Sequence, residues 1–509
     1  MSHGLFTSLY ETGQPFALVD TRERRDYVDG HWFGSTNIPL SVLTNRIGRM
    51  VPDRAFPLHL LDWHDAASEA ASRRLSALGY TDVKLCPTAH PGHYGHGFVK
   101  GEYVWSKAFG EVVAKTCGLP EVTPAAYLES QTDLQLFDVR PTSEYREFTI
   151  PGSYSLPNSL LLGNMEGLKH TGRTALLHCA GRTRSIIGAC TLKAAGHEGP
   201  FAIFRGGTQA WQLDGHEREF AADRIFADET GSDAAPRAFL ARWKIPVEDI
   251  KADECAAFVR RHRDNLLFDV SDDAAKGKSL QHGIMGVSGT NLIQQTDQSI
   301  ARYHVPVILF DTGSGSRAAF AAYWLQAMGY TVRVALLTAT LHEMPGMGSD
   351  VSGTETGFAP ATLDQLIAHR NMSGRIYDFR SSQAFREAHL AGSEWRNIGE
   401  VLSGDPSAQR PDEPIMVIAY DLTHGYETAE LLARHDWQVA GVFSWEISDS
   451  HKVEIQAGGP ADAIDESALF AGRHHGNMQD SRDYLAWEEE LPDQIDPMIL
   501  EVWKRHLGS

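Results

Sequence analysis

The chain has 509 residues, of which 42% are hydrophobic and 22% are charged, a composition typical of soluble globular proteins. This length is too great for one hydrophobic core, so we expect about three to five domains. With 46 basic and 66 acidic residues, the formal net charge is −20, which argues against a general binder of nucleic acids or of anionic membranes.

The N-terminus has neither the basic nor the apolar segment of a secretion signal, and no long apolar run occurs anywhere in the chain. We therefore expect a cytoplasmic protein that does not bind membranes. None of the cysteines has Cys-x-x-Cys spacing, so neither a disulfide framework nor a zinc site is indicated. We expect no metal and no other cofactor. The five cysteines are Cys86, Cys117, Cys179, Cys190 and Cys255.

A repeat is visible when the chain is read in order. Four times, a short apolar strand ends in aspartate, and a second apolar strand, a loop and a helix follow. The spacing from the aspartate to the first loop position is nearly constant. The four pairs are Asp20 and Asp62, Asp138 and Cys179, Asp269 and Thr312, and Asp378 with Ala419 or its neighbour Tyr420.

A third apolar strand closes each repeat, at residues 83–85, 201–204, 332–336 and 439–443. Strands that alternate with helices predict an α/β protein in which each unit is an open, mainly parallel sheet flanked by helices. Ligands of such sheets bind at the carboxyl ends of the strands. The first loop positions lie at such ends.

Only the second repeat has a cysteine at that position, and it follows the apolar strand 175–178. The loop from Cys179 contains Arg182 and Arg184 and ends at Ser185, which could cap the next helix. Backbone N–H groups and the positive end of a helix would stabilise a thiolate and bind an anion here. We predict Cys179 as the catalytic residue, and as substrate-binding residues Ala180, Gly181, Arg182, Thr183, Arg184 and Ser185.

The second repeat resembles a rhodanese-type sulfurtransferase domain. The resemblance rests on Asp138-Val139-Arg140, Glu144-Tyr145, the turn 150–153, the loop 179–185 and the closing segment 205–211. Weaker versions of these motifs cover the other repeats, so the whole chain resembles a tandem array of four rhodanese-like domains with one catalytic cysteine.

Charged segments and segments rich in Gly, Ser and Thr mark the boundaries. We place rhodanese-like units at 1–100, 123–222, 247–342 and 361–454, of which only the second is catalytic. Linkers are expected at 101–122, 223–246 and 343–360, and a helical tail at 455–509. Residues 105–111, in the first linker, could come near the mouth of the Cys179 loop.

The resemblance implies an enzyme of the thiosulfate sulfurtransferase type. The Cys179 thiolate would take a sulfur atom from a small anionic donor such as thiosulfate, hold it as a persulfide, and pass it to a thiol or to cyanide. The backbone amides of residues 180–185 would hold the persulfide and the donor's charge. Arg182 and Arg184 would add positive charge for the donor. The oligomeric state is expected to be a monomer or a homodimer.

Two alternatives stay open. A phosphatase or arsenate reductase could use the same scaffold, but such phosphatases use Cys-x5-Arg, whereas Arg184 gives Cys-x4-Arg and a tighter loop. Alternatively, the chain could be a mainly non-catalytic sulfur-binding or scaffold protein, since three repeats lack the cysteine.

Several other residues are interpreted as structural. His178 and Cys179 are neighbours on a strand and should point to opposite faces, so we do not expect His178 to act as a base. Asp138 and Arg140 are expected to form a pair that shapes the loop. The Gly- and Ser-rich loop 311–317 could bind an anion, but we favour a loop without that function.

Overall fold

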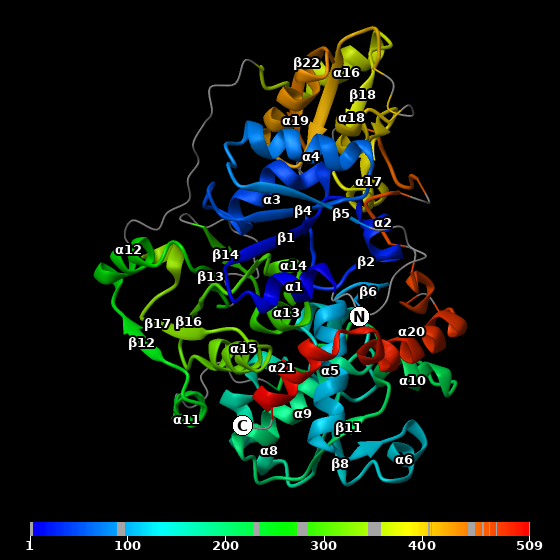
Figure 1. The fold of residues 1–509 in the computed structure, drawn as a ribbon. Helices are drawn as coiled ribbons and strands as arrows, with labels where there is room; N and C mark the ends of the chain where they lie inside the picture. The colour runs from blue at the N-terminus through cyan, green and yellow to red at the C-terminus, as the bar shows by residue number, and fades with distance from the viewer. Residues whose placement is uncertain are drawn as a thin grey trace.

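The computed structural model describes residues 4–88, 97–226, 234–271, 283–344, 358–405, 408, 410–445, 454–460, 463–467, 469–474 and 476–507. These residues form an α/β protein with several mainly parallel sheets flanked by helices, which confirms the predicted fold class (Figure 1). No helix in the described part of the chain is both long and apolar enough to cross a membrane.

The first sheet has the order β15-β1-β4-β5, with β3 also paired to β1. Its strands are β1 (Phe16–Asp20), β3 (Thr36–Asn37), β4 (Leu58–Asp62), β5 (Val83–Pro87) and β15 (Arg302–Tyr303), and β15 is antiparallel to β1. The helices are α1 (Leu5–Glu11), α2 (Arg24–Asp29), α3 (Leu43–Met50) and α4 (Ala66–Ala77). A separate antiparallel pair joins β2 (His31–Trp32) to β6 (Phe98–Val99).

The second sheet, which contains the cysteine loop, has the order β7-β11-β10-β8-β9 with every pair parallel. Its strands are β7 (Glu121–Val122), β8 (Leu134–Asp138), β9 (Tyr154–Ser155), β10 (Thr174–His178) and β11 (Phe201–Phe204). The helices are α6 (Pro124–Glu129), α7 (Thr142–Glu147), α8 (Met165–His170), α9 (Thr183–Ala195) and α10 (Gly207–Leu213).

The third sheet has the parallel order β12-β17-β16-β13-β14. Its strands are β12 (Val247–Ile250), β13 (Leu266–Asp269), β14 (Ile284–Gly286), β16 (Val307–Thr312) and β17 (Val332–Leu337). The helices are α11 (Ala234–Arg242), α12 (Ala252–Arg261), α13 (Gly289–Gln294), α14 (Thr296–Ser299) and α15 (Ser316–Ala327).

The fourth sheet has the parallel order β20-β18-β21-β22. Its strands are β18 (Ile376–Asp378), β20 (Glu394–Trp395), β21 (Ile415–Ala419) and β22 (Val439–Ser444). The helices are α16 (Leu363–Asn371), α17 (Ser382–Glu387), α18 (Ile398–Ser403) and α19 (Leu422–Arg434). A small antiparallel pair joins β19 (His389–Leu390) to β23 (Ile455–Gln456).

Helix α5 (Val104–Cys117) lies in the segment predicted as the first linker, and it is buried in the middle of the molecule. Trp105 stacks on Phe33 of the first unit with ring centroids 4.9 Å apart. Phe109 packs edge-on against Trp324 of α15 at 5.8 Å. Large apolar side chains project from α5 in several directions. The helix therefore contributes to the hydrophobic cores beside more than one sheet.

Within the segment predicted as a helical tail lie α20 (Met478–Glu490) and α21 (Pro497–Leu507). Both lie against α5, as the red and cyan ribbons in Figure 1 show. Trp503 of α21 is fully buried and packs edge-on against Trp105 and Phe109, in each case at 5.3 Å. The tail therefore completes the core that surrounds α5.

Candidate active site

Cys179 is the first residue after β10, and only 2% of its surface is exposed. Helix α9 begins four residues later, at Thr183, and its first-turn N–H groups have no partners within the helix. The Cys179 Sγ lies 3.9 Å from the Ser185 Oγ, which donates a hydrogen bond of 2.8 Å to the carbonyl of Arg182. The prediction that Ser185 caps the helix is wrong, because Arg182 is the N-cap residue and Ser185 lies in the first turn.

The backbone of the closing segment, residues 205–211, is hydrogen-bonded to the backbone of the cysteine loop. The N–H groups of Thr208 and Gln209 donate to the carbonyls of Cys179 and Ala180 at 3.0 and 3.1 Å. Gly207 has a φ of +55°, and a Cβ atom there would lie 2.2 Å from the Cys179 carbonyl oxygen. Only glycine fits this position, because both the backbone conformation and the close approach exclude a side chain.

Both loop arginines are already paired with carboxylates. Arg182 binds Glu111 of α5 through two hydrogen bonds of 2.9 and 3.1 Å, and it also lies 2.9 Å from Glu489 of α20. Arg184 donates to both carboxylate oxygens of Glu144, at 2.7 and 2.9 Å. The guanidinium groups therefore fasten the loop to its surroundings, and their charges are balanced locally.

His178 faces away from the cysteine, as expected for adjacent residues of a strand. Its Nε2 lies 2.7 Å from the Ser153 Oγ, and burial lowers the pKa of the imidazole to about 4. Arg140 pairs with the buried Asp138 at 2.8 Å. Burial by itself raises the pKa of this carboxyl, but Arg140 holds it at about 2. The predicted Asp138–Arg140 pair is confirmed, and His178 is a neutral side chain bonded to Ser153.

A cavity of about 30 Å³ adjoins Cys179. Its walls are the cysteine loop and side chains from three elements outside the domain, namely Lys107 of α5, Gln294 of α13, and Tyr484 and Glu488 of α20. A Cβ atom on Gly181 would lie 3.0 Å from the Tyr484 ring and 3.1 Å from the Glu488 Oε2. The cavity has about the volume of one water molecule, so a larger ligand requires the covering side chains to move.

The position of α5 confirms that residues 105–111 come near the Cys179 loop. Gln294, Tyr484 and Glu488 were not among the predicted site residues. They are far from Cys179 in the sequence, and no motif links them to it. The available signal was Lys107 within the largely apolar segment 104–113, because buried charged residues are rare unless they are paired or functional. The segment that forms α20 is mostly charged and polar, so Glu488 does not stand out there.

The other sheets have different side chains at the corresponding place. Asp62, Thr312 and Ala419 are the last residues of β4, β16 and β21. In the loop 311–317, the N–H groups of Thr312 and Ala318 donate to the carboxylate of Asp311 at 2.8 and 3.0 Å. The chain's own carboxylate therefore occupies the anion-binding position considered for this loop. Tyr420 lines a cavity of about 270 Å³ between the first and fourth sheets.

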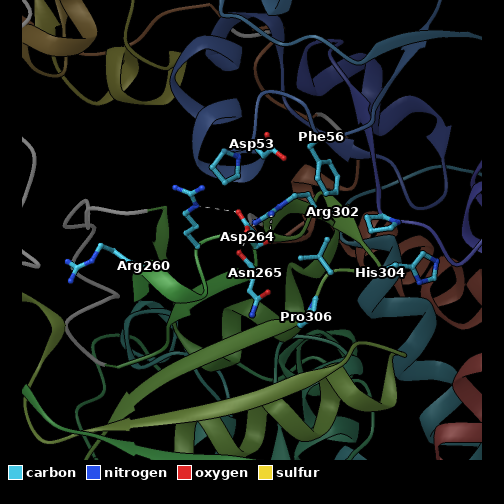
Figure 2. A pocket seen from close by; sticks show the side chains of 12 residues that line it. Asp53, Phe56, Arg260, Asp264, Asn265, Arg302, His304 and Pro306 are labelled. Atoms are coloured by element: carbon cyan, nitrogen blue, oxygen red, sulfur yellow. Dashed lines mark hydrogen bonds and ion pairs between the residues drawn. The ribbon is translucent and has the colours of Figure 1, made fainter. Parts of the chain in front are cut away.

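A cavity of about 800 Å³ lies between the first and third sheets and away from Cys179. Figure 2 shows Phe56, Arg302 and Asp264 in its wall. The Arg302 guanidinium donates to the carbonyls of Asp264 and Asn265, at 3.0 Å each. Cysteine is absent from its lining, and no cluster of metal ligands occurs among the described residues.

Comparison with known proteins relates this site to a family. Residues 123–214 match the model of the rhodanese-like domain. No curated protein sequence matches the chain. A thiosulfate sulfurtransferase from Pseudomonas aeruginosa superposes with a TM-score of 0.82 and 25% sequence identity, over 96% of both chains. A 3-mercaptopyruvate sulfotransferase from Escherichia coli is 17% identical, with a TM-score of 0.21, over 42% of this chain and 97% of its own. Residues 123–214, which contain the Cys179 loop, are therefore a rhodanese-like domain.

Proposed function

We propose that the protein is a sulfurtransferase and that Cys179 carries the transferred sulfur as a persulfide. The observation that carries the proposal is the position of Cys179, at the carboxyl end of β10 and before the N-terminus of α9, inside a rhodanese-like domain. The similarity along nearly the whole chain to a protein described as a thiosulfate sulfurtransferase supports it.

In the proposed reaction, the Cys179 thiolate attacks the outer sulfur of thiosulfate. A Cys179–sulfur bond forms, the sulfur–sulfur bond of thiosulfate breaks, and sulfite leaves with the electron pair. An acceptor thiolate or cyanide then attacks the outer sulfur of the persulfide, which restores the Cys179 thiolate. The N–H groups of residues 180–185 stabilise the negative sulfur in both steps.

We also propose that the four sheets are the centres of four rhodanese-like units with the boundaries predicted above, and that only the second unit is catalytic. Two strands depart from these boundaries, since β7 lies in the predicted first linker and β15 joins the first sheet from the third unit. The first, third and fourth units have Asp62, Thr312 and Ala419 or Tyr420 where the nucleophile would be. Their proposed role is to build the walls and the surroundings of the Cys179 site.

The test is the intact mass of the protein after incubation with thiosulfate and removal of the excess. We expect the wild type to gain one sulfur atom, cyanide to remove it as thiocyanate, and Cys179→Ser to gain none. Cys86→Ser, which removes a half-buried thiol elsewhere, is the matched control and should behave as the wild type. An equal gain in Cys179→Ser, or no gain in the wild type, would overturn the proposal. Cys179-dependent hydrolysis of an aryl phosphate would instead indicate a phosphatase.

A further inference from the structure

The positive charges around Cys179 differ in how far they are neutralised. Arg182 is held by Glu111 and Glu489, and Arg184 by Glu144. When a guanidinium donates its hydrogen bonds to carboxylates, the negative charge of these carboxylates offsets most of its attraction for a further anion. The attraction of an anionic donor must therefore come from another group.

Lys107 is the cation in the cavity wall that makes no ion pair with a described residue. It extends from α5 and is only 7% exposed. Its Nζ donates a hydrogen bond to the hydroxyl of Tyr484 and lies 4.2 Å from the centre of that ring and 5.0 Å from the ring of Trp487. Aromatic rings and a hydroxyl hold the ammonium group in place without neutralising it.

The cavity wall also contains a carboxylate, that of Glu488, whose negative charge opposes the positive charge of Lys107. Its Oε1 accepts hydrogen bonds from the hydroxyls of Thr183 and Tyr484, but its buried Oε2 has no partner among the described residues. Tyr484 bonds to both charged groups and so fixes Lys107 and Glu488 on the same side of the cysteine loop.

We propose that Lys107 is the residue that selects an anionic sulfur donor, by binding the donor's oxyanion group above Cys179, and that Glu488 opposes this selection. The specificity of the site is then set by α5 and α20, which lie outside the rhodanese-like domain. The choice of a sulfur donor as the ligand rests on the proposed function, whereas the preference for an anion at Cys179 does not.

The test uses two alkylating reagents of the same size, iodoacetate and iodoacetamide. With either, the Cys179 thiolate attacks the methylene carbon, a sulfur–carbon bond forms, and iodide leaves with the electron pair. The rate of each alkylation at Cys179 is followed by peptide mass mapping. The ratio of the two rates reports the preference for an anion, because changes in access or in thiolate content affect both reagents alike.

We expect Lys107→Met to lower the ratio of the iodoacetate rate to the iodoacetamide rate by about tenfold, the effect of losing one charge-assisted contact. Lys107→Arg should restore most of the ratio. Adding Glu488→Gln to Lys107→Arg should raise the ratio further, because the arginine keeps its proton when the carboxylate is removed. The matched control is Lys169→Met, since Lys169 is an exposed lysine of the rhodanese-like domain that pairs with Glu198. An unchanged ratio in Lys107→Met overturns the proposal. If Lys107→Met does not fold, a ratio that fails to rise when Glu488→Gln is added to Lys107→Arg overturns the proposal.

Persulfide formation separates this inference from the proposed function. With thiosulfate, Lys107→Met should raise the donor concentration needed for half-maximal rate by about tenfold, with a smaller effect on the maximal rate. If the wild type forms no persulfide but the alkylation ratio still falls in Lys107→Met, the sulfurtransferase proposal fails and the anion site stands. If persulfide forms and neither quantity changes in Lys107→Met, the reverse holds.

Discussion

At the scale of residues, the cysteine loop is built mainly from backbone contacts and paired charges. The carbonyls of Cys179 and Ala180 are fixed by N–H groups of the closing segment, and Arg182 and Arg184 are fixed by carboxylates. Such a loop has little freedom to rearrange when sulfur is added to the cysteine. Preorganised N–H donors can then stabilise a negative sulfur without further reorganisation.

Gly207 is the residue whose replacement tests this rigidity. Gly207→Ala places a methyl group against the Cys179 carbonyl, so we expect a loss of about 1–3 kcal/mol of unfolding free energy and slower alkylation of Cys179. Gly172→Ala is the control, because Gly172 also has a positive φ but an added Cβ would meet no atom within 4 Å. Urea unfolding measures both variants, and equal losses would show that the contact with Cys179 is unimportant.

The pH dependence of anion preference tests the charge of Lys107. Burial lowers the pKa of Lys107 to about 8, against the opposing effect of Glu488, and Arg473 lowers it further while Glu102 raises it. The cation is present below this pKa and is lost as the pH rises through it. The ratio of iodoacetate to iodoacetamide alkylation should therefore fall between about pH 7 and pH 9 in the wild type.

Two comparisons isolate the role of Lys107 in that pH profile. Lys107→Arg should keep a high ratio across the range, because arginine stays protonated. Tyr484, which bonds to Lys107, does not account for a fall near pH 8, because burial raises its pKa well above the ordinary value. A flat profile in the wild type would contradict the assignment.

The sequence was informative where the loop depends on neighbours in the chain. The strand, the cysteine, the two arginines and the closing glycines lie within a single repeat, and local patterns therefore indicated them. Glu144, which binds Arg184, lies in the same repeat, but the partners of Arg182 could not be found in this way. Glu111 and Glu489 reach Arg182 only because α5 and α20 pack on the loop, and pairing between distant segments leaves no periodic signal.

At the scale of elements, α20 covers the cysteine loop. Its Trp487 donates a hydrogen bond of 3.0 Å to the carbonyl of Lys100, and a Cβ atom on Gly101 would lie 2.1 Å from this ring. These contacts hold α20 against the segment that leads into α5. Because the cavity is small and Tyr484 and Glu488 of α20 line it, we expect the docking of α20 to control access to Cys179.

Trp487→Ala should therefore open the site. Removal of a packed indole weakens the docking of α20, and we expect iodoacetamide to alkylate Cys179 about tenfold faster. Met478→Ala changes an exposed side chain at the start of the same helix and should leave the rate unchanged. If Trp487→Ala reacts at the rate of the wild type, then access to Cys179 does not pass beneath α20.

At the scale of the whole molecule, the four sheets and their helices are interlocked. Strand β15, which lies between α14 and β16 in the chain, pairs with β1 of the first sheet. Trp324 of α15 donates to the Thr191 hydroxyl of α9 at 2.9 Å, and Asn397 donates to Glu23 of the first unit at 3.1 Å. One hydrophobic cluster contains residues of all four sheets. The repeat pattern predicted the sheets but not these contacts, because a repeat specifies each unit and not how the units pack.

Asp297 tests how tightly the third unit is bound to α5. This residue of α14 is 4% exposed, and its carboxylate accepts a hydrogen bond of 3.4 Å from the backbone N–H of Trp105. Burial raises its pKa to about 7, so the folded state keeps a proton that the unfolded chain releases near pH 4. Asp297 therefore contributes stability that is fully present below about pH 4 and is lost as the pH rises to about 7.

Asp297→Asn removes this titration while keeping the size of the side chain. Relative to the wild type, the variant should gain stability between pH 4 and pH 7, by about 2–4 kcal/mol in all, and should gain no more above pH 7. Thermal unfolding at several pH values measures the difference. Asp264→Asn is the control, because the Asp264 side chain is 83% exposed and meets water in both states. A difference that does not grow with pH would mean that the interface around α5 admits water and that the third unit is less firmly bound than its contacts indicate.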